Sequence, residues 1–127
     1  MRAYAQIVPT FWTRGSGKRL REDRDARLLA LYFMTCPSSS MLGIFYLPLT
    51  TITHETGFSA EEIRDVLPRI AEIVRYDEEA ELVWLPQGAK HQIGPTMSGK
   101  DKRRPAVIRE LQLVAGHPFA AEFMARY

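Results

Sequence analysis

The stretch of sequence that decides the fold spans residues 48–73 and reads PLTTITHETGFSAEEIRDVLPRIAEI. Gly57 is a natural residue to end a first helix. Ser59 followed by Glu62 matches a capping box, in which the side chain of each residue bonds the backbone N–H of the other. Apolar residues then recur at helical spacing, at Ile63, Val66, Leu67, Ile70 and Ile73. The stretch predicts a helix, a glycine turn and a capped second helix that Pro68 kinks or shortens.

The flanking segments complete the pattern of a winged helix-turn-helix. Residues 22–35 predict a helix that ends before Pro37, with an apolar stripe at Leu28, Leu31, Tyr32 and Thr35 that Leu29 and Phe33 widen. Residues 43–47 predict a short buried strand, and the β-prone runs 74–76 and 82–85 flank an acidic turn and predict a hairpin. Strand 43–47 can pair with this hairpin in a small sheet. The predicted fold class is therefore mainly α with a small β-sheet.

A C-terminal helical extension follows the predicted winged helix. Pro105 starts one helix and Gly116 ends it, and a final short helix carries Phe119, Phe123 and Tyr127 on one side. A helix of about ten residues is marginal alone, so we expect it to dock on its own domain or on a second copy. The predicted organisation is a basic N-terminal arm (1–21), a winged-helix domain (22–89), a basic linker (90–104) and the helical extension (105–127).

Length and composition exclude several classes of protein. With 127 residues, 46% hydrophobic and 25% charged, the chain is typical of one soluble globular domain. No apolar run approaches a membrane span, and residues 1–9 lack the apolar centre of a signal peptide, so we expect a cytoplasmic protein without membrane contact. Cys36 is the single cysteine, which excludes an intramolecular disulfide and a cysteine-cluster zinc site.

Charge is distributed in three blocks although the formal net charge is only +2. Residues 1–21 hold five basic residues and no acid. Residues 22–89 hold five arginines against twelve acids, and residues 90–127 hold seven basic residues against three acids. An acidic middle thus lies between two basic segments. Such segments can be solvated surface, or they can form an electrostatic surface for a phosphate backbone.

Several stretches resemble a known family. They are Ala26–Tyr32, Met41–Leu49, Arg75–Glu78 with Val83-Trp84, Phe11–Thr13 and Pro118–Tyr127. In these stretches the chain resembles bacteriophage replication-initiation proteins with a DnaD-like N-terminal winged helix. The resemblance implies origin or single-strand DNA binding, contacts with a replicative helicase or its loader, and self-association. Such initiators usually continue into a further C-terminal region, so we expect this chain to carry part of that activity.

The candidate DNA contacts lie mainly in the basic flanks. In a helix-turn-helix the second helix normally enters the major groove, but here its exposed residues are four acids with Arg64 and Arg69, and the turn of the hairpin is acidic too. The flanks offer flexible basic runs, with Phe11 and Trp12 available for base stacking. The candidate DNA-binding residues are Arg14, Lys18, Arg19, Arg21, Arg64, Arg69, Lys100, Lys102, Arg103 and Arg104.

Three functions remain open from the sequence. The favoured hypothesis is a DNA-binding accessory in replication initiation or helicase loading, acting on duplex or single-stranded DNA as a homo-oligomer. The alternatives are a winged-helix transcriptional regulator and an interaction adaptor that binds no DNA.

Catalytic and cofactor sites find no support in the sequence. Residues 94–101 nearly match a phosphate loop, but Asp101 stands where a Ser or Thr should hold magnesium, so a flexible basic linker is the better interpretation. His54, His91 and His117 are far apart and lack the spacing of a metal site. No nucleophile with a supporting base can be assembled. We therefore expect no enzyme activity, no metal and no cofactor.

Overall fold

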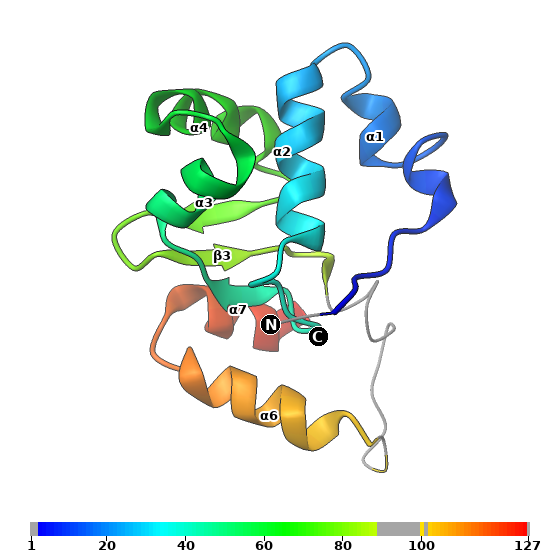
Figure 1. Cartoon of the computed structure of the whole chain (residues 1–127). Coiled ribbons are helices and arrows are strands. Elements are labelled where there is room, and N and C mark those ends of the chain that lie inside the picture. The colour runs from blue at the N-terminus through cyan, green and yellow to red at the C-terminus, as the bar shows by residue number, and fades with distance from the viewer. Residues whose placement is uncertain (1–2, 89–99, 101, 127) are drawn as a thin grey trace.

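Three short strands form one antiparallel sheet in the middle of the molecule, and helices lie on both sides of it (Figure 1). The structure is a computed structural model and describes residues 3–88, 100 and 102–126. Its elements are η1 (Pro9–Phe11), α1 (Ser16–Arg19), α2 (Arg24–Thr35), β1 (Ile44–Tyr46), α3 (Leu49–Thr56), α4 (Ala60–Val66), η2 (Leu67–Ile70), β2 (Arg75–Asp77), β3 (Leu82–Trp84), α6 (Arg104–Leu113) and α7 (Pro118–Arg126). The predicted fold class, mainly α with a small β-sheet, is confirmed.

The sheet has the strand order β1-β3-β2, so β3 is the central strand and pairs antiparallel with both neighbours. Val83 lies opposite Phe45 of β1 and Tyr76 of β2. Successive side chains of a strand point to opposite faces. Val83 and Phe45 accordingly belong to one apolar cluster, whereas Leu82 and Trp84 belong to a second. The predicted pairing of the first strand with the hairpin is confirmed.

The first cluster, which we call the helical core, joins the sheet to α2, α3, α4 and η2. Its buried helical residues include Leu29, Phe33, Ile52, Ile63 and Ile70. The predicted stripe of α2 was partly wrong: Leu29 and Phe33 are buried as expected, but Leu28 is 52% exposed and Thr35 is exposed. The buried face of α2 is instead Ala26, Leu29, Ala30 and Phe33. These four residues have the same helical spacing, and the two alanines leave room for a close neighbouring helix.

The two helices predicted on either side of Gly57 form with the expected local chemistry. Gly57 ends α3 with φ 82°, the left-handed conformation that favours glycine. The Glu62 N–H donates to Ser59 Oγ at 3.1 Å, and the Ser59 N–H donates to the Glu62 carboxylate at 2.9 Å, so the capping box is confirmed. Beyond Val66 the chain tightens into the 3₁₀ helix η2, because Pro68 has no N–H to continue the α-helical ladder.

The second cluster, which we call the C-terminal core, covers the opposite face of the sheet. Val107 of α6 and Phe123 of α7 pack with four buried residues, Leu42, Ile44, Leu82 and Trp84. Figure 1 shows α6 and α7 on the side of the sheet away from α2, α3 and α4. The last helix therefore docks on its own domain, which is one of the two arrangements expected from its short length.

Two polar contacts tie α7 and the residue before it to β2. Arg75 and Asp77 lie on the same face of the sheet as Trp84 and Leu82, their partners in the register. Arg75 Nη1 donates to Glu122 at 2.7 Å, and Asp77 Oδ2 lies 2.8 Å from His117 Nε2. His117 Nδ1 accepts the N–H of Phe119 at 3.0 Å, so a neutral imidazole carries its proton on Nε2 and donates it to Asp77.

Some predicted features lie outside the described residues. They are positions 90–99 and 101 of the linker 90–104, the near-match to a phosphate loop apart from Lys100, and the residues His91 and Tyr127. Among the described residues, none of the helices combines the length and the apolar composition needed to cross a bilayer.

A pair of glycine substitutions tests the turn between α3 and α4. A Cβ at Gly57 or at Gly116 would meet no atom within 4 Å, but only Gly57 has a positive φ. We expect Gly57→Ala to destabilise the protein by about 1 kcal/mol, because a Cβ strains the left-handed conformation. Gly116→Ala should change stability by less than about 0.5 kcal/mol. Urea denaturation measures both, and equal effects would contradict the assigned turn.

Acid should selectively weaken the contact between β2 and His117. The hydrogen bond with His117, followed by that from the Ala80 N–H, holds the pKa of Asp77 below its usual value. A carboxylate with a lowered folded pKa stabilises the fold above its unfolded pKa of about 4, and loses that contribution as pH falls through the folded value. We therefore expect Asp77→Asn to destabilise the protein at pH 7 and to approach wild type near pH 2.

Denaturation curves at pH 7, 5, 3 and 2 measure this difference. Glu79→Gln is the matched control, because Glu79 is exposed in the same turn and its side chain makes no hydrogen bond or ion pair among the described residues. If the difference in free energy of unfolding between wild type and Asp77→Asn stays constant down to pH 2, the charge of the carboxylate does not contribute to stability.

Candidate nucleic-acid interface

Arg64 on α4 and Arg69 on η2 are both paired with acids. Arg64 donates to both carboxylate oxygens of Glu78 in the hairpin turn, with its shortest contact at 2.6 Å. This bond holds the pKa of Glu78 below its usual value. Arg69 on η2 lies 2.7 Å from Asp23 and 3.4 Å from Asp65. Neither guanidinium is free to meet a phosphate or a base without leaving an acid unpaired.

The surface around these arginines is acidic. Glu61, Glu62 and Asp65 of α4 are exposed, as is Glu79 in the turn between β2 and β3. Ion pairs this exposed contribute little to folding stability, so DNA could displace them. The released carboxylates would then lie beside the phosphates and repel them. The geometry therefore disfavours docking of α4 in the major groove.

In the N-terminal basic segment, residues 12–27, most of the exposed cations are not paired with acids in the described structure. Arg14, Lys18, Arg21 and Arg24 are exposed, and among the described residues none of the four makes a side-chain ion pair. Arg19 is the exception, because its Nη1 lies 2.9 Å from Glu72. Arg14, Lys18 and Arg21 were predicted from the sequence, whereas Arg24 was missed because acids flank it on both sides.

The predicted flexible arm is folded in the structure. Residues 9–11 form η1 and residues 16–19 form α1, which lies beside α2 (Figure 1). Gly17 allows this packing, because a Cβ there would come within 2.6 Å of the Phe11 ring. Phe11 is only 8% exposed. The prediction that Phe11 stacks on bases was therefore wrong, since its ring is buried against Gly17 of α1.

Of the two aromatic residues predicted to stack on bases, Trp12 remains available for that contact. Its side chain is 51% exposed, and the Phe11 ring meets it edge to face with centroids 4.8 Å apart. The Arg27 guanidinium lies 5.5 Å from the centre of the indole, and Arg27 Nε donates to the Gly17 carbonyl at 3.0 Å. Arg27 was also missed from the sequence. It anchors Trp12 and α1 to α2, so that cations and an aromatic ring share one folded unit.

The second basic segment, which contains Lys100, Lys102, Arg103 and Arg104, lies at the start of α6. Lys100, Lys102 and Arg104 are exposed, and Arg103 is half-buried before α6. Figure 1 shows the start of α6 and the helix α1 on opposite sides of the sheet. The predicted cations thus form two separate basic regions and not one continuous surface.

The chain matches no protein-family model, and neither a curated protein nor a solved structure is significantly similar to it. The resemblance to phage replication-initiation proteins therefore stays a prediction from the sequence.

Proposed function

We propose that this protein binds DNA through the N-terminal basic segment, with low sequence selectivity and a preference for single strands. The observation that carries the proposal is that some of the basic side chains are paired with acids and others are not. Arg64 and Arg69 are occupied by acids, whereas Arg14, Lys18 and Arg21 are exposed and unpaired in the described part of the chain. Free cations release counterions when they meet phosphates, which drives binding without regard to sequence.

Trp12 supports the preference for single strands. A half-exposed indole next to unpaired cations can stack on a base, and unpaired bases expose the faces that stacking needs. The bases of a duplex are already stacked on one another, so Trp12 adds little there. Phosphate contacts would be shared by both forms of DNA, and the indole contact would be specific to the single strand.

The role that we propose for this binding is replication initiation or helicase loading. The resemblance of residues 26–86 to phage initiators supports it, as does the order helix, strand, helix, helix, strand, strand, which a winged helix would have. DNA held on the N-terminal segment would leave α4 and the hairpin turn free for a helicase or loader. Self-association also stays a prediction, and Leu113 and Met124 are exposed apolar residues that a second copy could cover.

Three double variants that each remove two charges test where DNA binds. They are Lys18→Gln with Arg21→Gln, Lys102→Gln with Arg104→Gln, and Arg64→Gln with Arg69→Gln. We expect the first to weaken single-strand binding about tenfold at moderate salt and to lower the salt slope by about 1 to 2, because each phosphate contact contributes about 0.7 to the slope. The second should have a smaller effect, and the third should stay within about twofold of wild type.

Fluorescence anisotropy with a mixed-sequence oligonucleotide, single-stranded and duplex, measures these effects over a range of salt. Loss of binding in the Arg64/Arg69 variant alone would contradict the proposal and favour major-groove docking. Strong preference for one duplex sequence would favour a transcriptional regulator, and no binding of either DNA would favour the adaptor.

Replacement of Trp12 tests the preference for single strands. We expect Trp12→Ala to weaken single-strand binding about tenfold, as loss of one stacked base predicts, and to leave duplex binding within about twofold. Trp12→Phe is the control, because it keeps an aromatic ring at the same place. The same anisotropy titration measures all three proteins, and equal losses on both forms of DNA would argue against stacking.

A further inference from the structure

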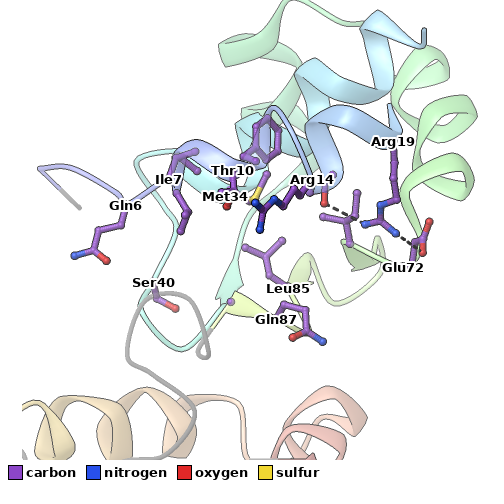
Figure 2. A pocket seen from close by; sticks show the side chains of 16 residues that line it. Gln6, Ile7, Thr10, Arg14, Arg19, Met34, Ser40, Glu72, Leu85 and Gln87 are labelled. Atoms are coloured by element: carbon purple, nitrogen blue, oxygen red, sulfur yellow. Dashed lines mark hydrogen bonds and ion pairs between the residues drawn. The ribbon is translucent and has the colours of Figure 1, made fainter. Parts of the chain in front are cut away.

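A cavity of about 370 Å³ lies between residues 6–19 and the rest of the domain (Figure 2). Residues 6–8, η1 and the start of α1 form one side of it. The other side is formed by residues near the end of α2, before β2 and after β3. Most of its wall is apolar, from Ile7, Val8, Phe11, Met34, Ile73 and Leu85.

The polar side of the cavity has one unpaired cation. Arg19 and Glu72 both line it, but they neutralise each other across 2.9 Å. Arg14 also lines it and makes no side-chain ion pair among the described residues. Figure 2 shows Arg14 directed into the space that the labelled side chains enclose. A ligand in this mostly apolar cavity would therefore meet one positive charge that no acid in the described part of the chain neutralises.

These features define the chemistry of a ligand. The volume lies at the lower end of small-molecule pockets, which span about 300–1,000 Å³. Apolar walls favour an apolar body, and burying such a body is favourable in proportion to its area. A guanidinium forms strong, charge-assisted hydrogen bonds with a carboxylate or phosphate. A sugar–phosphate backbone alone would not suit the cavity, because it has no apolar part to fill it.

We propose that this cavity binds an amphipathic organic anion, with its apolar body against Met34, Ile73 and Leu85 and its anionic group on Arg14. Two sources share this chemistry. One is a free acyl or aryl carboxylate, and the other is a nucleotide whose base fills the cavity while its phosphate meets Arg14. Arg14 is common to this cavity and to the proposed DNA-binding surface, whereas Lys18 and Arg21, whose double variant tests DNA binding, do not line the cavity.

The test uses the full chain and the fluorescent probe 1-anilinonaphthalene-8-sulfonate, an aromatic monoanion. We expect saturable binding of one probe molecule per chain. Arg14→Gln should weaken it about tenfold, because the charge-assisted hydrogen bond is lost. Val8→Trp should abolish it by filling the cavity from a position that is half-exposed and tolerant of a larger side chain. Arg24→Gln is the matched control and should bind as wild type, because Arg24 is exposed and does not line the cavity.

Competition identifies the source of the ligand. Displacement by decanoate but not by decanol supports a free carboxylate, because the two differ in the anionic group. Displacement by deoxyadenosine monophosphate supports the nucleotide. The proposal is overturned if Arg14→Gln and Val8→Trp both bind the probe as wild type does, if decanol competes as well as decanoate, or if neither decanoate nor the nucleotide competes. Unchanged DNA binding in Val8→Trp together with lost probe binding would support the cavity as a ligand site that DNA binding does not need.

Discussion

The alternation of side chains along β3 is the constraint on which the rest of the molecule depends. Val83 points into the helical core, while Leu82 and Trp84 point into the C-terminal core. β3 is also the strand that pairs on both sides. If the register of β3 slipped by one residue, each of its side chains would move to the opposite face of the sheet. Trp84 would then point toward the helices that now pack around Val83. Both layers of helices are therefore positioned by three residues of one strand.

Alternation along β2 likewise determines which face of the sheet its charged side chains occupy. Arg75 and Asp77 flank Tyr76 on β2 and point to the face that α7 covers, where they meet Glu122 and His117. The part of the N-terminal basic segment before α2 contributes no buried residue to either core, although Leu20 packs against the helical core. This part is attached to the rest of the domain by polar contacts, from Arg27 on α2 to the Gly17 carbonyl and from Arg19 to Glu72. Its remaining cations stay free because no acidic element faces them closely enough to form an ion pair in the described structure.

Features set by neighbouring residues could be predicted from the sequence, and features set by distant ones could not. The Ser59–Glu62 capping box, the turn at Gly57 and the hairpin all depend on short-range chemistry. The buried face of α2 could not be decided, because Leu28 and Leu29 are equally apolar and only packing distinguishes them. Pairing of Arg69 with Asp23 joins residues 46 positions apart. The glycines at 15 and 17 indicated a flexible arm, and nothing in their own sequence showed that Phe11 would pack on Gly17.

The register between β1 and β3 also has a consequence for the order of folding. The hairpin of β2 and β3 closes over a few residues, whereas pairing Ile44 with Trp84 closes a loop of roughly 40 residues that contains α3 and α4. The entropy lost on closing that loop falls once α3 and α4 have already shortened it. We therefore expect β1 to pair late, after both helices have formed, and the C-terminal helices to cover the sheet only once β1 is in place. The face of the sheet that holds Trp84 and Ile44 would then be the last to be buried.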